Sequence, residues 1–266
     1  MNGVQIINAT TLDDAWFQAL SLVMSEQGRQ YKVDKGSFEG IQRQGMKLVI
    51  NIMHPGIRPL EPIVPPDCPP PTTSAKIEEY YQTQIVTNIK AVNEHYTYGE
   101  DLWWELGWVI EHYKSGGYGT NHCYMTVGRP ESLFFYDREV DYEDHITVKD
   151  RQTGQLLWER KISNEWNKDP QNDPSSQCLR GIDSWIEEGK LHFWVYFRSW
   201  DLLSGFPQNL GGFQLLKEEM AKAIGVQDGI MIASGKDLHV YEHSWAVACL
   251  RLRKDFKEKE EVREEV

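Results

Sequence analysis

The residues best suited to chemistry in this 266-residue chain cluster after a single predicted strand. An Arg198-Ser199 pair is followed by Asp201 and, eight positions later, by Asn209, while Cys178 precedes Arg198 by 20 residues. An ionised thiol can act as a nucleophile, and a side-chain amide offers a hydrogen-bond donor and an acceptor together. The alternatives are an inert core position for the cysteine and an N-cap role for the asparagine. The fixed offsets indicate a site.

A strand, a turn and a helix are expected to position these residues. Residues 190–198 alternate strictly, so that Leu191, Phe193, Val195 and Phe197 share one face and His192, Trp194, Tyr196 and Arg198 share the other. A Pro/Gly turn follows, and residues 210–224 have the spacing of an amphipathic helix closed by Gly225. Residues 229–234 read as a buried strand.

The rest of the chain predicts mixed strands and helices, which indicates an α+β fold. A helix over residues 12–26 is capped by Thr10 or Thr11, and helical spacing recurs at 77–92 and 101–114. The other expected elements are a short strand at 4–8, two strands within 36–53 around residues 42–45, and a hairpin of 145–150 with 155–162. Trp103, Trp104 and Trp108 are expected in the core. The proline-dense segment 54–71 is either a rigid connector or a substrate-facing loop.

The motifs resemble those of the thymidylate synthase family. Arg198, Ser199 and Asp201 match its Arg-Ser-x-Asp group, and Gly205, Pro207 and Asn209 match its Leu-Gly-x-Pro-Phe-Asn-Ile group, although Ser204 and Gln208 depart from it. Cys178 occupies the position of the nucleophile, and residues 237–241 reproduce an Asp-x-His-x-Tyr segment. The resemblance implies a three-layer fold in which a large mixed sheet packs against a second subunit.

The resemblance also implies roles for individual residues. Cys178 would add to C6 of a pyrimidine, and this reaction requires a low pKa of its thiol. Arg198 would favour the thiolate form of Cys178. Asn209 would read uracil, since its amide matches the O4 acceptor and the N3–H donor. Asp201 and Gly205 would contact the folate. The remaining implied roles are substrate binding by Ser199, His239 and Tyr241, a phosphate grip by Arg29, and general acid/base catalysis by Glu61.

Several positions depart from the family pattern and keep three functions open. Leu179 follows the cysteine in place of the usual His, and Asn121 and His122 stand where the family donates an arginine pair across the dimer. Tyr80 and Tyr81 are the aromatic residues nearest to the family's shielding tryptophan. The leading hypothesis is transfer of one carbon from 5,10-methylenetetrahydrofolate to C5 of dUMP, giving dTMP. The alternatives are hydroxymethylation of dUMP, dCMP or CMP, as in the divergent branch with archaeal synthases and phage-type hydroxymethylases, and a non-catalytic nucleotide-binding homologue.

Composition bounds the remaining expectations. A formal charge of −12 argues against a general nucleic-acid or membrane surface, so any anionic ligand must be held by local arginines. The four cysteines have no CxxC spacing, which favours reduced thiols, no metal site and a cytoplasmic location. We expect one catalytic domain over residues 1–252 with an insertion at 131–177, a charged tail at 253–266, and a homodimer.

Overall fold

The computed structural model describes residues 3–34, 38–92, 94–128, 145–149, 153–161 and 177–254. The chain divides into two compact units, one formed by residues 1–127 with 178–266 and one by residues 128–177. The second unit contains an antiparallel hairpin of β5 (His145–Lys149) and β6 (Leu156–Lys161), which confirms the predicted hairpin. The predicted tail from residue 255 onward lies outside the described residues.

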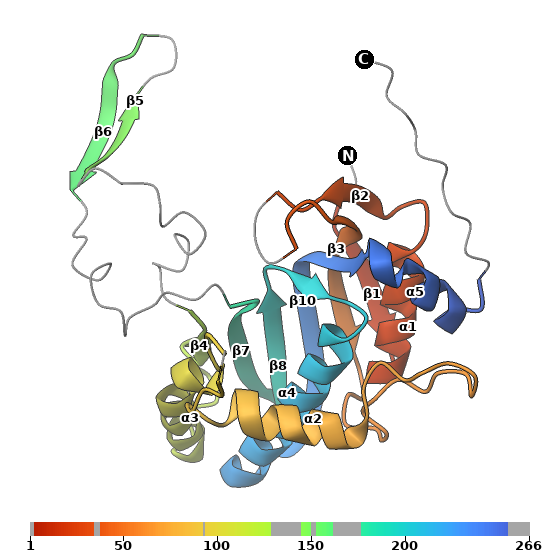
Figure 1. Ribbon diagram of the computed structural model, residues 1–266. Helices are drawn as coiled ribbons and strands as arrows, with labels where there is room; N and C mark the ends of the chain where they lie inside the picture. Colours follow the sequence, from red (N-terminus) through yellow and green to blue (C-terminus); the bar gives the residue numbers. More distant parts are fainter. Residues whose placement is uncertain are drawn as a thin grey trace, which may run out of the picture. The chain divides into compact units, whose positions relative to one another are not determined.

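The first unit is built on an eight-stranded mixed sheet with the order β1-β3-β10-β8-β7-β4, in which β2 also pairs with β3 and β9 with β10 (Figure 1). β10 runs parallel to β8 and antiparallel to β3. The sheet and its helices confirm the α+β class. The strands are β1 (Gln5–Ala9), β2 (Arg29–Lys32), β3 (Gln42–Ile52), β4 (Tyr124–Thr126), β7 (Leu179–Glu187), β8 (Lys190–Phe197), β9 (Trp200–Asp201) and β10 (Gln227–Tyr241).

The helices α1 (Leu12–Val23) and α4 (Gly205–Ile224) pack against the central strands of the sheet and against each other. α2 (Ser74–Tyr80) and the π-helix η1 (Tyr81–Ile85) pack on α4. The other helices are α3 (Gly99–Lys114), the 3-10 helix η4 (Glu242–Ser244) and α5 (Trp245–Arg251). Thr11 caps α1, because its hydroxyl accepts from the backbone N–H of Asp14 at 3.2 Å. In the described part of the chain, no helix combines the length and apolar character needed to cross a membrane.

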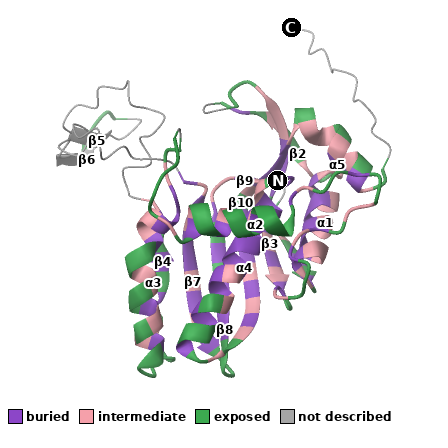
Figure 2. Ribbon diagram, turned by 60° about the horizontal axis from the view of Figure 1, so that its bottom comes forward, coloured by how far each residue is buried: buried purple, intermediate pink, exposed green. Residues whose placement is uncertain are grey.

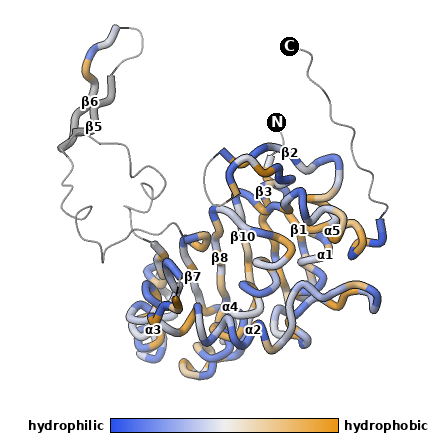
Figure 3. The backbone as a smooth tube through the Cα atoms, viewed as in Figure 1, coloured by the Kyte–Doolittle hydropathy of each residue, from blue (hydrophilic) through white to orange (hydrophobic). Residues whose placement is uncertain are grey.

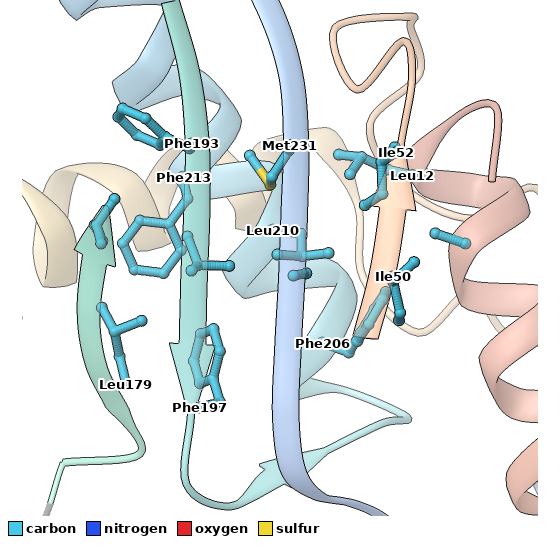
Figure 4. Close-up of a cluster of buried hydrophobic side chains, with 14 of the residues drawn as sticks. Leu12, Ile50, Ile52, Leu179, Phe193, Phe197, Phe206, Leu210, Phe213 and Met231 are labelled. Atoms are coloured by element: carbon cyan, nitrogen blue, oxygen red, sulfur yellow. The ribbon is translucent and has the colours of Figure 1, made fainter. Parts of the chain in front are cut away.

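The core between α4 and the central strands fixes the helix over the end of β8. Phe193 and Phe197 of β8 are fully buried beside Phe213 of α4, while Leu210 of α4 lies over β10 and Phe206 lies beside Ile50 of β3 (Figure 4). Burying one such side chain contributes roughly 1.5–3 kcal/mol. Hydrophobic and hydrophilic positions alternate along β8, as predicted (Figure 3).

Two adjacent glycines let α2 and η1 approach α4 closely. A Cβ on Gly211 would lie 2.8 Å from side-chain atoms of Ile77, and one on Gly212 would lie 2.7 Å from Ile85 and 2.9 Å from Tyr80. The backbone N–H of Tyr98 then donates to the carbonyl of Gln84 at 2.7 Å, which ties the start of α3 to η1. These contacts bring Tyr80 and Tyr98 to the N-terminal end of α4.

The opposite face of the sheet carries large side chains that the described residues leave exposed. Trp194 is 44% exposed and Tyr196 38% exposed, whereas Phe193 and Val195 on the helix side are fully buried. Register places Tyr124, Asp183, Trp194 and Ile232 in one row across four strands. This row therefore holds two aromatic side chains, a carboxylate and an isoleucine.

Three element predictions were wrong. Trp103, Trp104 and Trp108 are 64%, 63% and 48% exposed, because α3 packs through Leu102, Val109 and Tyr113 and turns the tryptophans outward (Figure 2). β3 runs unbroken through residues 42–45 and pairs there with β2, so the predicted break into two strands is absent. Gly45 allows the backbone of β10 to approach closely, because a Cβ at this position would lie 2.8 Å from the carbonyl oxygen of Leu238. The helix predicted over 77–92 ends at Ile85.

Candidate active site

An antiparallel hairpin places Cys178 beside Arg198. β7 and β8 are joined by a tight turn at Glu188 and Gly189, whose φ angles are 49° and 72°, and they pair Leu179 with Phe197. The backbone N–H of Arg198 donates to the carbonyl of Cys178 at 2.9 Å. The interval of 20 residues between the two is therefore the length of one hairpin.

The thiol of Cys178 lies between a cation and a hydroxyl. Burial raises the pKa of the Cys178 thiol, while the Arg198 guanidinium and a hydrogen bond with the Tyr96 side chain lower it; burial prevails, and the pKa lies above its ordinary value. The predicted low thiol pKa is therefore wrong for this structure, although Arg198 acts in the expected direction.

Cys178 opens into a cavity of about 510 Å³ that gathers most of the predicted site. Its lining includes Ser199, Asp201, His239 and Tyr241. Arg251 lines it as well, a buried guanidinium that donates to the carbonyl of Pro69 at 3.0 Å and that the motifs did not indicate. A volume of this size suits one small-molecule ligand.

A network around Asp237 holds His239 in this cavity. Tyr31 donates to Asp237 Oδ1, Arg43 lies 2.9 Å from Oδ2, and His239 Nδ1 lies 3.5 Å from Oδ2. Burial alone would raise the pKa of Asp237, but the hydrogen bonds from His239 and Tyr31 and the charge of Arg43 bring it below its ordinary value. Within the described residues, the buried Nε2 of His239 has no hydrogen-bond partner, so it can bind a ligand group.

Arg29 lies in a second cavity of about 830 Å³. Arg43, Lys47, Lys236 and Asp237 also line it, and the Arg29 guanidinium lies 5.4 Å from the Tyr31 ring centroid. Arg43 and Asp237 belong both to this lining and to the network that holds His239. Four cations against one carboxylate make it the natural place for an anion.

Asn209 lies inside α4, so the predicted N-cap role is wrong. Its Oδ1 accepts from Trp200 Nε1 at 2.8 Å, and its Nδ2 donates to the Tyr80 hydroxyl at 2.5 Å. Together with Gly205, Tyr96 and Tyr98 it lines a third cavity, of about 680 Å³. A Cβ on Gly205 would lie 3.6 Å from both Asn209 Oδ1 and Asp201 Cβ, so residues that line the two cavities are neighbours at this point.

Asp201 organises the start of α4. Its carboxylate accepts from the backbone N–H groups of Leu203 at 3.0 Å, Ser204 at 3.3 Å and Gly205 at 3.4 Å, and from the Ser204 hydroxyl. An anion at a helix N-terminus is stabilised by the helix dipole. Pro207 falls within the first turn, where its missing N–H costs no helical hydrogen bond.

Glu61 is the predicted residue that the structure does not bring to these cavities. Both of its carboxylate oxygens accept from the Ser74 hydroxyl, at 2.8 and 2.7 Å, beside the start of α2. Glu61 is absent from the described linings of all three cavities. The described residues also contain no group of three or more His, Cys, Asp or Glu side chains placed to hold a metal ion.

The residues that the motifs missed are Tyr96, Tyr98, Arg43 and Arg251. Tyr98 had a local signal, since Tyr98-Gly99 opens α3. Arg43 had a spacing signal as well, since it follows Arg29 by 14 residues, the interval between two arginines of the family. Tyr96 and Arg251 reach the site through packing between distant segments.

Comparisons with known proteins support the motif resemblance. A family model described as thymidylate synthase matches residues 151–263. A protein of Methanosarcina acetivorans named "Putative thymidylate synthase" is 25% identical over 247 residues, covering 91% of each chain. A protein of Methanocaldococcus jannaschii with the same name is 30% identical over 167 residues, covering 59% of this chain and 71% of the relative.

The chain belongs to the thymidylate synthase family. The family implies a transferase that acts on a nucleotide and normally uses methylenetetrahydrofolate. The residues present fit such ligands, because Cys178 lines a cavity of small-molecule size in which, among the described residues, the buried Nε2 of His239 has no hydrogen-bond partner.

Proposed function

We propose that the protein transfers one carbon from 5,10-methylenetetrahydrofolate to C5 of a uridylate, with reductive methylation of dUMP to dTMP as the reaction. The observation that supports this most is the hairpin that sets Cys178 beside Arg198, with Cys178 opening into a cavity that Asp201 and His239 also line. Asn209, the proposed base-reading group, lines a separate cavity.

Cys178 acts as the nucleophile in this proposal. Its thiolate adds to C6 of the pyrimidine, the C5–C6 π electrons move toward O4, and C5 becomes nucleophilic. Arg198 opposes the effect of burial on the thiol and favours the ionised form. Folate, when bound, supplies the one-carbon unit and, for methylation, the hydride.

Asn209 selects the base. Trp200 and Tyr80 leave one lone pair on its Oδ1 and one proton on its Nδ2, which match the N3–H donor and O4 acceptor of uracil. A hydrogen bond to O4 strengthens as charge accumulates there, so the same amide stabilises the adduct.

The remaining predicted residues are assigned to the ends of the ligands. His239 and Tyr241 hold the sugar, since they line the thiol cavity, and Ser199 lies beside them. Arg29 binds phosphate in the adjoining basic cavity. Asp201 and Gly205 face the folate, and Glu61 remains the predicted general acid/base.

We also propose a homodimer formed through the exposed face of the sheet. The exposed side chains of Tyr124, Trp194 and Tyr196 supply apolar area on this face. Arg198 comes two residues after Tyr196, so it is expected on the same face. A monomer in sedimentation equilibrium at micromolar concentration would contradict this assignment.

Hydroxymethylation is the second candidate, and the polarity of the Asn209 cavity favours it. Lys76, Glu79, Glu94 and His95 line that cavity, and such groups attract water. The two reactions share the cysteine adduct and differ in whether hydride or water completes the product, so exclusion of water decides between them.

One incubation tests both reactions. The protein is mixed with methylenetetrahydrofolate and dUMP, dCMP, UMP or CMP in separate reactions, and the nucleotide products are identified by mass spectrometry. We expect dTMP with stoichiometric dihydrofolate from dUMP. A product one oxygen heavier than dTMP, with tetrahydrofolate recovered, would support hydroxymethylation, and no product from any nucleotide would support the non-catalytic homologue.

A further inference from the structure

The side chain of Tyr31 contacts two arginines and a carboxylate at once. The guanidinium carbons of Arg29 and Arg43 lie 5.4 and 4.8 Å from the centroid of its ring, within the range of a cation–π interaction. Its hydroxyl donates to Asp237 Oδ1, while Arg43 lies 2.9 Å from Oδ2 of the same carboxylate. None of the sequence motifs includes Tyr31.

Strand register explains why these side chains meet. Tyr31 of β2 pairs with Arg43 of β3. Arg29 precedes Tyr31 by two residues, so the two side chains share a face of β2. Gly45, two residues after Arg43, leaves room for the carboxylate, since a Cβ there would lie 2.8 Å from Asp237 Oδ1. Three neighbouring strands, β2, β3 and β10, therefore contribute to one cluster.

We infer that Tyr31 is a positioning residue that holds Arg29 in place for anion binding, with Asp237 as its anchor. Arg29 lines the cavity of about 830 Å³. A long arginine side chain loses conformational freedom when it binds an anion, and a ring that restrains it beforehand removes part of that cost. The identity of the anion as a nucleotide phosphate rests on the proposed function, whereas the restraint of Arg29 does not.

The charges around Tyr31 favour this role. A tyrosine ring attracts a guanidinium through its electron-rich face, and donation from its hydroxyl to a carboxylate increases that electron density. Burial and the hydrogen bond to Asp237 raise the pKa of Tyr31 above its ordinary value, so its hydroxyl is a donor at neutral pH. Asp237 also lies 3.5 Å from Nδ1 of His239, which lines the cavity into which Cys178 opens. Through Asp237, Tyr31 therefore connects the arginine of one cavity with the histidine of the other.

A double-mutant cycle in the full chain tests the inference. The midpoint of thermal unfolding is recorded in phosphate-free buffer against increasing dUMP and, separately, inorganic phosphate, which gives a dissociation constant for each ligand. We expect Tyr31→Leu to weaken both ligands about tenfold in the wild-type background and less than about twofold in an Arg29→Gln background, because no arginine is then left to position. A merely structural role would weaken binding by the same factor in both backgrounds.

Tyr31→Phe separates the hydroxyl from the ring. It keeps the ring beside both guanidinium groups but removes the hydrogen bond to Asp237, so we expect binding to weaken about threefold. Tyr81→Phe is the matched control, since Tyr81 also donates to a carboxylate, that of Glu219, and is not among the described linings of either cavity. Its dissociation constants should equal those of the wild type. If Tyr31→Leu does not fold, Tyr31→Phe in the two backgrounds provides the test.

Three results would overturn the inference: equal losses for Tyr31→Leu with and without Arg29, an equal loss in Tyr81→Phe, or a wild type that binds neither dUMP nor phosphate. A wild type that shows the coupling but makes no product from any nucleotide would instead contradict the proposed function and leave the role of Tyr31 intact. Coupling with phosphate but no binding of dUMP would likewise contradict only the uridylate substrate.

Discussion

Cys123 is buried and Cys178 partly buried, each near a tyrosine hydroxyl, yet only Cys178 has the neighbours of a nucleophile. Burial raises the pKa of both thiols, and Tyr96 and Tyr113 respectively lower it. The difference is charge: Arg198 lowers the pKa of Cys178, whereas the carboxylate of Asp183 raises that of Cys123. Cys178 also lines a cavity of about 510 Å³. A nearby cation and access to ligand, more than burial or a hydroxyl, separate the two sites.

The largest expected effect comes from removing each sulfur in turn. Cys178→Ser should reduce turnover more than about a thousandfold, because a serine hydroxyl is hardly ionised near neutral pH and does not add to C6. Cys123→Ser should leave turnover within about twofold and act mainly on stability. Product formation and thermal unfolding measure the two effects. More than a tenth of the activity remaining in Cys178→Ser would remove this residue from the mechanism.

The second prediction isolates the cation. Arg198→Gln should slow iodoacetamide alkylation of Cys178, followed by mass spectrometry of its peptide, about tenfold at pH 8, because the pKa rises further when the opposing positive charge is lost. Arg180→Gln, on the adjacent strand β7, is the control and should leave the Cys178 profile unchanged. Equal slowing in the two variants would show that any loss of positive charge on the protein slows the alkylation. The positive charge of Arg198 would then no longer distinguish Cys178 from Cys123.

Local offsets in the sequence predicted the part of the site that one hairpin and one helix start create. The spacing of Cys178 and Arg198 corresponds to the antiparallel pairing of β7 and β8, so the motif encodes the contact directly. Residues 229–241 were similarly readable because Asp237, His239 and Tyr241 share a face of β10. The contact of Tyr80 with Asn209 was not readable, since Tyr80 reaches Asn209 only through the close approach of α2 and η1 to α4 at Gly211 and Gly212.

The exposed tryptophans show a different limit. The buried stripe of α3 is set by Leu102, Val109 and Tyr113, and a tryptophan one position after Leu102 points away from it. The residue type predicted buried tryptophans, but their position around the helix axis places them on the exposed face. Position around the helix axis was the better guide.

The third prediction turns from charge to hydrogen bonding. Asn209→Asp replaces the amide Nδ2 that donates to Tyr80 with a carboxylate oxygen, which can only accept. Product formation from dUMP and from dCMP measures the effect. Base preference should move toward cytidylate by about tenfold, because a carboxylate accepts from the N4 amino group and opposes O4. A wild type that already prefers dCMP would refute this assignment of Asn209.

The smallest expected effect concerns the charge beside Cys123. Because burial and Asp183 raise the folded-state pKa of this thiol, the folded chain holds its proton more tightly than the unfolded chain does. The resulting stability is present below the unfolded pKa, about 8.5, and is lost as the pH rises through the folded value.

Asp183→Asn keeps an oxygen for the N–H of Ser184 but removes the charge, so the loss of stability at high pH should become smaller. Between pH 7 and 9.5 we expect the decline in the free energy of unfolding, measured by urea titration, to shrink by roughly half a kcal/mol, and to do so only while Cys123 is present. The same shrinkage in a Cys123→Ser background would assign the effect to Tyr113 or Tyr124, whose pKa values Asp183 also raises, and would remove the thiol from this side of the comparison.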